Sequence, residues 1–405
     1  MISSYRVRAG FGTVHLVVAV GSVALIIGVL IPAIQKSRSS ALYLQCQRNL
    51  MQLGQALHSY HAANQCFPPG VVSGTHVAAG PPPQSGEVSG MLPPCTGALS
   101  FLLPYLGRED LYKQIPPEFL STECTQKSWA YSTPPFDTQN RNNTGLPSWA
   151  MPRCQTLECP AAAVDSNSAS HFSVVDEYVP TASIDGPQWG GNPTILFTPG
   201  GEGRSEVWCD WVPPTTPGFP GPNVADLSTT NYAANGGSLG QCNPRETLQS
   251  FLARNKSYAS PDRDVQTYSD VANIPALPLV SYLGPFGVNT RTRLIDITDG
   301  SSNTLAFGET LGGVAFPDGP TEFRFARAAG VTLPALGAIQ LRPVLGAYSS
   351  NHAGVANFLW CDGSVRPIRK FGILAFDNLP AAWYVFQAAA GMHDGLAIDP
   401  GLIAE

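Results

Sequence analysis

His352 and Asp362 are two side chains that could exchange a proton, as an imidazole and a carboxylate do in general acid–base sites. Asp362-Gly363 is typical of a tight turn between two strands, because Gly adopts positive φ readily. This places Asp362 at the tip of a hairpin and His352 about 30 Å away along an extended strand. We therefore predict structural roles. Asp362 should hydrogen bond within the turn, and His352 should bond to backbone where the strand begins.

A second group of polar side chains carries the oxygen atoms that calcium prefers. It comprises Asp296, Asp299, Ser301 and Asn303. Their spacing does not match the EF-hand loop. The same residue types are also common in turns, where their side chains bond to nearby backbone groups. We interpret the segment as a capped turn, with calcium binding as the alternative.

The nine cysteines form no Cys-x-x-Cys pair and no Cys–His group with the spacing of a zinc site. In an oxidising compartment some of them would pair, and Cys154 with Cys159 is one example. The odd count leaves at least one free thiol, and buried, unpaired cysteines are equally compatible with the sequence. We expect neither a metal nor another cofactor.

Two common catalytic motifs are also missing from the sequence. It contains no P-loop and no His-Glu-x-x-His. The net charge is −6, and no cluster of basic residues follows residue 50, so nucleic acid is not an expected partner. We therefore expect no enzymatic activity and assign no catalytic residue.

The composition describes the frame that must position these side chains. Only 13% of residues are charged, against roughly 25% in soluble domains, while Gly and Pro number 40 and 37. Hydrophobic residues make up 43%, which is enough for a core. This combination predicts long turns and loops on a compact framework.

Residues 11–31 carry no charged side chain, and 21 residues suffice for a helix to cross a hydrocarbon core of about 30 Å. Basic residues flank the run on both sides, at Arg6 and Arg8 and again at Lys36 and Arg38, so charge alone does not orient it. A cleavable export signal is the alternative, with small residues available for cleavage at 37–41, but its apolar core is usually shorter.

The helical pattern continues beyond the apolar run. Pro32 should kink the helix without ending it. An apolar stripe then recurs at spacings of four and three, at Cys46, Leu50, Leu53, Leu57 and Tyr60. We predict one helix over about residues 11–64. The segment 32–66, which follows the apolar run, should lay this stripe against a folded domain.

The N-terminal segment resembles the class III signal of type IV prepilins and type II secretion pseudopilins. The resemblance rests on Gly10-Phe11, the apolar run and Pro32. It implies that residues 1–10 are a leader, that prepilin peptidase cuts after Gly10, and that Phe11 becomes the methylated N-terminus. The family usually has Glu at the fifth mature position, where this chain has His15. An imidazole cannot supply that negative charge, which bears on assembly into a filament.

The rest of the chain shows short strand patterns between turns. We expect short helical turns near residues 100–112, and strands near 171–178, 194–197, 206–212, 279–283, 304–307 and 355–361. The last of these is followed by the turn at Asp362-Gly363 and a return strand at 364–368.

Further blocks resemble a large bacterial family of prepilin-type proteins of unknown function with a C-terminal His-x9-Asp-Gly motif. Here the motif is His352, Asp362 and Gly363, within residues 351–368. Other matching blocks are 49–61, 67–70, 230–233 and 297–309. The resemblance implies a pilin-like helix-plus-sheet fold outside the cytoplasm, and it implies no reaction.

Together these features predict an α+β, pilin-like chain: a long transmembrane and amphipathic helix packed on an antiparallel β-sheet with large loop-rich insertions. Residues 67–405 should form an extracytoplasmic domain held by a single pass through the inner membrane. The expected function is a structural or assembly component of a type II secretion or type IV pilus-like system, with the bilayer and other pseudopilin-like subunits as partners. The alternative is a tethered solute- or polysaccharide-binding protein that uses Trp189, Trp208 and Trp211.

Overall fold

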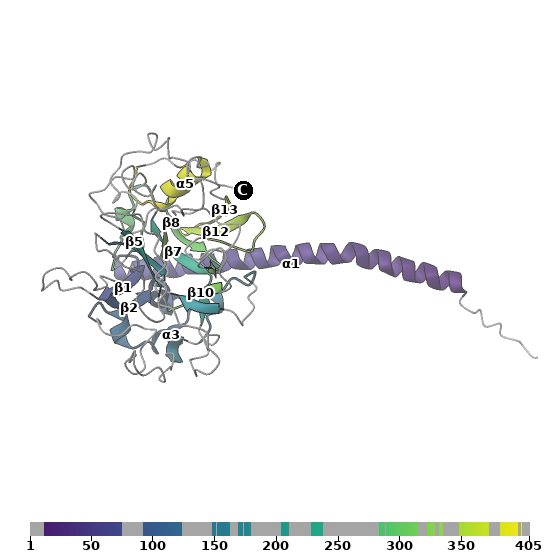
Figure 1. Ribbon diagram of the computed structural model, residues 1–405, viewed down its shortest axis with the longest axis horizontal. Coiled ribbons are helices and arrows are strands. Elements are labelled where there is room, and N and C mark those ends of the chain that lie inside the picture. The colour runs from purple at the N-terminus through teal and green to yellow at the C-terminus, as the bar shows by residue number, and fades with distance from the viewer. Residues whose placement is uncertain are drawn as a thin grey trace, which may run out of the picture.

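Figure 1 shows the computed structural model, in which one long helix runs through a mixed body of small helices and strands and projects far beyond it. The structure describes residues 12–74, 92–123, 148–150, 152–162, 169–172, 174–179, 204–209, 228–237, 283–287, 289–314, 322–328, 332–334, 348–371, 381–395 and 398.

The long helix, α1, spans Thr13–Asn64 and continues through Pro32, as predicted. Its 52 residues correspond to roughly 78 Å at 1.5 Å per residue. Gln65 ends it in the left-handed conformation (φ 59°), and its N–H bonds to the carbonyl of His61. The chain then turns away toward Phe67 and the two prolines that follow it.

The two halves of α1 have different surroundings. Among the described residues, α1 is the one helix long and apolar enough to cross a membrane, and its most apolar window is wholly exposed. The predicted stripe is buried in the body from Cys46 to Leu57 and half-buried at Tyr60, while Gln52 and Gln55 face solvent. The single helix therefore passes from an uncovered apolar segment directly into the protein core.

Small helices cover one side of the buried half of α1, below it in Figure 1. They confirm the helical turns expected near residues 100–112. The helices of this region are α2 (Ala98–Leu102), η1 (Pro104–Leu106), α3 (Glu109–Tyr112), η2 (Pro117–Leu120), η4 (Ser148–Ala150) and η5 (Gln155–Leu157).

Seven strands on the opposite side form a sheet in the order β13-β12-β8-β7-β11-β4-β5. They are β4 (Val174–Val179), β5 (Arg204–Cys209), β7 (Tyr232–Gly237), β8 (Leu305–Glu309), β11 (Thr332–Pro334), β12 (Val355–Trp360) and β13 (Val365–Arg369). The four strands from β13 to β7 pair antiparallel, as predicted. β11 pairs parallel with both of its neighbours, which the strand patterns did not indicate.

Two smaller sheets complete the described strands. One joins β1 (Val71–Gly74) to β2 (Leu92–Gly97), antiparallel. The other centres on β10 (Glu322–Ala326), which pairs with β3 (Ala169–Phe172), β6 (Thr229–Thr230) and β9 (Gly313–Val314). The strand expected at 171–178 is thus two strands in two sheets, and the one expected at 194–197 lies outside the described residues.

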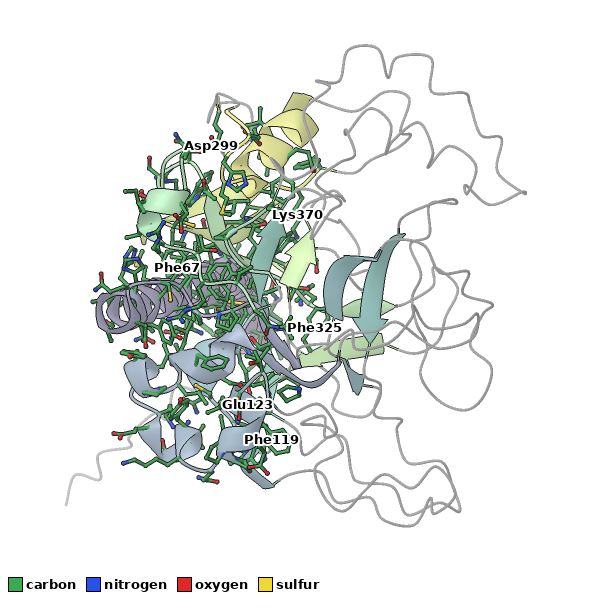
Figure 2. The ribbon with its side chains drawn as sticks, turned by 90° about the vertical axis from the view of Figure 1, so that its left-hand side faces the viewer. Phe67, Phe119, Glu123, Asp299, Phe325 and Lys370 are labelled. Atoms are coloured by element: carbon green, nitrogen blue, oxygen red, sulfur yellow. A yellow bond between two sulfur atoms is a disulfide. The ribbon has the colours of Figure 1, made fainter. Side chains whose placement is uncertain are left out.

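Helices cover both faces of the large sheet at β12. Leu359 faces α1, while Phe358 packs against Phe386 of the C-terminal helix α5 (Ala381–Ala390). All six residues of β12 are buried for this reason, although alternate side chains point to opposite faces. In Figure 2, where α1 is seen nearly end-on, Phe67 lies beside this helix.

The predicted hairpin is present at β12 and β13, with residues 361–364 between the two strands in place of the expected 362–363. The carbonyl of Trp360 accepts from the N–H of Gly363, and the N–H of Trp360 donates to the carbonyl of Ser364, both at 2.9 Å. Gly363 has φ 86°, so glycine supplies the positive φ that closes the loop. The hairpin tip reaches α1 at Gly54.

Replacing Gly54 with valine is expected to lower the free energy of unfolding by about 1–3 kcal/mol, because the helix and the hairpin tip leave no room there. A Cβ at Gly54 would lie 2.8 Å from Cδ1 of Leu359 and 3.3 Å from the carbonyl oxygen of Gly363. Denaturant unfolding of the full chain in detergent measures the loss. Gln55→Val, on the exposed side of the same turn, is the control. Equal stability of the two variants would contradict this close packing.

Candidate functional site: a buried glutamate, histidine and disulfide

A group of buried polar side chains lies where α1 crosses the large sheet. Glu309 ends β8, and Asn357 lies on the neighbouring strand β12. Cys46 comes from α1, whereas Cys159 and His352 come from loops. We call Cys46, Cys159, Glu309 and His352 the buried cluster; all four are buried.

His352 is placed by the segment that leads into β12. Its backbone N–H donates to the hydroxyl of Ser350, and its ring lies edge-on to Tyr43 of α1. Nε2 is 3.2 Å from Oε1 of Glu309 and 3.7 Å from Sγ of Cys159. The prediction that this ring bonds to backbone is therefore wrong, because the fold brings a carboxylate from another strand within reach.

Glu309 is held from its other side by Asn357. Oε2 accepts the backbone N–H of Asn357 at 2.6 Å, and the amide nitrogen of the same residue lies 3.2 and 3.3 Å from the two carboxylate oxygens. Gln47 of α1 donates in turn to Oδ1 of Asn357 and to the hydroxyl of Tyr43. The carboxylate therefore has a fixed orientation, with Oε1 directed at His352.

Lys370 supplies a cation near the cluster, and Figure 2 shows it on the sheet side of α1. Its ammonium donates to the carbonyl oxygens of Ser350 and His352. Burial lowers the pKa of Lys370, and the negative charge of Glu309 partly opposes this shift. The lysine therefore fixes the segment that carries His352 and offsets the charge of Glu309.

Tyr232 closes the cluster from β7, opposite Glu309 in the strand register. Its hydroxyl donates to the carbonyl of Cys46 at 3.4 Å. Burial, and then the charge of Glu309, raise the pKa of Tyr232 well above its ordinary value. The phenol therefore stays protonated and serves as a hydrogen-bond donor.

Cys46 and Cys159 form a disulfide that ties α1 to the loop after η5. The pairing of Cys154 with Cys159 is thus wrong, since Cys154 is a buried free thiol, as are Cys66 and Cys361. A second set of hydrogen bonds holds the same loop. Asn49 donates to the carbonyl of Glu158 at 2.9 Å, and Asn231 accepts from the N–H of Cys159 at 3.0 Å.

The buried cluster is the group of potential metal ligands found among the described residues. One ligand atom from each of its four residues lies within 4.8 Å of the others. Sequence reasoning missed this group, because its members are far apart in the chain. A usable signal was present in Leu305–Glu309, where a carboxylate ends an otherwise apolar strand and needs a buried partner.

The remaining predicted side chains form separate local structures. Asp362 accepts from the N–H and hydroxyl of Ser364 and pairs with Arg366, so its role in the turn is confirmed. In the candidate calcium segment, Asp296 pairs with Arg293, and both oxygens of Asp299 accept backbone N–H groups of residues 394 and 395. These carboxylates cap backbone and do not converge on one point.

Other predictions concern residues outside the described part of the chain. Gly10 and Phe11, the expected processing site, lie there, as do Trp189 and Trp211. Trp208 is in β5, but its side chain is outside the described set. His15 lies near the start of α1, on the exposed segment.

A family model described as a protein of unknown function (DUF1559) matches residues 35–207 and 279–370, which is more than half of the chain. All four residues of the buried cluster fall within the matched segments. No curated protein and no solved structure matches the chain.

Proposed function

This chain belongs to that family of proteins of unknown function (DUF1559), and we propose that it is a membrane-anchored, pseudopilin-like structural component of the cell envelope. One observation carries the proposal. A single continuous helix is bare and apolar over one membrane thickness, and its next turns form the centre of a folded body. Pilin-like subunits use a helix of this kind as both anchor and core.

The disulfide supports placing the body outside the cytoplasm. A bond between Cys46 and Cys159 persists in an oxidising compartment and is rare in the cytosol. Cys46 lies on α1 just where the helix enters the body, so the bond fastens the membrane helix to the folded domain.

The described part of the chain also favours a structural role over catalysis. In the buried cluster, Glu309 and His352 bind one another, and Asn357 and Lys370 hold the carboxylate and the histidine segment. The side chains that meet there bind α1, the sheet and a loop to one another. We propose that the protein is not an enzyme and that its partners are the bilayer, a prepilin peptidase and other pseudopilin-like subunits.

Mass spectrometry of the mature N-terminus of the membrane-extracted protein tests this proposal. We expect a chain that starts at methylated Phe11, with the body still joined to α1. A Gly10→Val variant should retain its leader while its body folds normally, which serves as the control for processing. An intact Met1 in the unmodified protein would count against prepilin processing. Cleavage after residue 37 would identify an export signal instead and would release the body from the membrane.

A further inference from the structure

The buried cluster contains a complete set of ligands for one metal ion, of which two are joined by a disulfide. We propose that Cys46, Cys159, Glu309 and His352 bind a single Zn²⁺ when the disulfide is reduced. The same four residues would thus have two alternative states. In one, the disulfide links α1 to the loop that carries Cys159, and in the other, the zinc ion links α1, this loop and the sheet.

The ligand atoms lie at distances that suit a tetrahedral zinc ion. Tetrahedral zinc with Zn–S near 2.3 Å and Zn–N or Zn–O near 2.0–2.2 Å requires its ligand atoms to lie roughly 3.3–3.8 Å apart. Nε2 of His352 is 3.2 Å from Oε1 of Glu309 and 3.7 Å from Sγ of Cys159. These two edges of the tetrahedron are already close to the required lengths. Reduction frees the sulfur atoms, and each can then turn about its own Cα–Cβ bond to complete the other edges.

The donor atoms are of the types that zinc prefers. Two thiolates, an imidazole and a carboxylate form a borderline-soft set that suits zinc better than calcium or magnesium. All four come from the protein and all are buried, which is typical of a closed structural site with no position left for a substrate.

Hydrogen bonds from neighbouring residues hold the ligands in place. Metal sites usually orient their ligands through a further layer of hydrogen bonds. Asn357 holds Oε2 of Glu309 at 2.6 Å and leaves Oε1 directed at the cluster. Ser350 and Lys370 hold the backbone of His352, and Asn231 holds that of Cys159. Cys46 has the hydroxyl of Tyr232 on its carbonyl, so each of the four ligands has a hydrogen-bond partner outside the cluster.

Charge balance also favours the metal. Zn²⁺ with two thiolates and one carboxylate carries a net charge of −1, which would be costly to bury alone. The charge of Glu309 already acts on the ammonium of Lys370, which is bonded to the carbonyl of His352. The positive charge of Lys370 offsets the net negative charge of the metal site, and Lys370 does not take a ligand position.

The exchange between the two states balances as follows. A dithiol delivers two electrons and two protons to the disulfide and itself becomes a disulfide. With a phosphine, which supplies the two electrons, water provides the two protons and the oxygen of the phosphine oxide. Either route yields the two thiols. Zinc binding then displaces one proton from each thiol. A metal at Nε2 of His352 requires the lone pair of that nitrogen, so the neutral ring would carry its proton on Nδ1.

The test uses the full chain in detergent, reduced in denaturant with a phosphine and refolded with Zn²⁺. After dialysis against metal-free buffer, we expect one zinc per reduced chain and none in chains refolded with the disulfide intact. Refolding with Co²⁺ should give the intense visible bands of a tetrahedral site, together with thiolate charge-transfer absorption. A reduced chain that retains no metal, or cobalt bands without thiolate character, would overturn the proposal.

Variants locate the metal. His352→Gln and Cys159→Ser are expected to weaken zinc retention at least tenfold, whereas Cys154→Ser and Cys361→Ser, which replace buried thiols outside the cluster, should bind like the unmodified chain. Zinc retained equally in all four variants would place the metal elsewhere and refute the assignment. If a ligand variant does not fold, the cobalt spectra of the two control variants decide the outcome. Unchanged thiolate charge-transfer bands in both support the assignment, and their loss in either variant refutes it.

Discussion

Replacing Glu309 with alanine is expected to lower the free energy of unfolding by about 3–5 kcal/mol, as when one partner of a buried charged network is removed. The carboxylate is almost fully buried and binds Asn357 through backbone and side chain and His352 through Oε1. Without it, the backbone N–H of Asn357 and Nε2 of His352 lose their partner inside the protein, and Lys370 loses a compensating charge.

Denaturant unfolding of the oxidised full chain in detergent, with a chelator present, measures this effect. Glu109→Ala is the matched control, because Glu109 pairs with Lys113 on the surface of α3 and such pairs contribute about 0–1 kcal/mol. Glu309→Gln should fall between the two, since an amide keeps the shape but supplies fewer acceptors. A loss in Glu309→Ala no larger than that in Glu109→Ala would show that the cluster does not stabilise the fold.

Loss of the disulfide is the second large effect. The double variant Cys46→Ala, Cys159→Ala should be less stable by about 2–5 kcal/mol, because the bond closes a loop whose ends are 113 residues apart. The destabilisation should be accompanied by faster proteolysis near the point where α1 enters the body, since the helix then depends on side-chain packing alone there.

The same unfolding experiment, again with a chelator, provides the measurement. Cys154→Ala controls for the packing lost when a buried sulfur is removed, and we expect a clearly smaller effect because Cys154 is a free thiol. If the double variant unfolds at the same denaturant concentration as Cys154→Ala, the disulfide does not contribute to the stability of the folded chain. The Glu309 and disulfide effects should not simply add, because the two groups are in contact through His352.

Glu309 and the disulfide lie at the same place along α1, where the helix enters the body. The part of α1 that is N-terminal to Cys46 is largely exposed. The part that is C-terminal to it packs between the sheet and the small helices. The buried cluster lies at this boundary and links the helix to β8, β12 and the Cys159 loop.

Features that depend on local patterns were predictable from the sequence. The apolar run and the stripe from Cys46 to Tyr60 specify α1, because a helix places residues three and four apart on one face. Asp362-Gly363 specifies the hairpin, because few other residues adopt positive φ at low cost. The α+β class follows from these patterns, since each element's partner face can be inferred from residues close to one another in the chain.

The cluster, by contrast, was decided by the tertiary structure. Its members come from positions 46, 159, 309 and 352, and they meet only because α1, β8 and β12 pack together. The same holds for the choice of Cys159 over Cys154 as the partner of Cys46, and for the parallel pairing of β11. Sequence spacing limits how residues close in the chain can meet, but it places almost no limit on residues separated by a hundred positions. Their contact depends on which buried faces pack together, and that is a property of the whole fold.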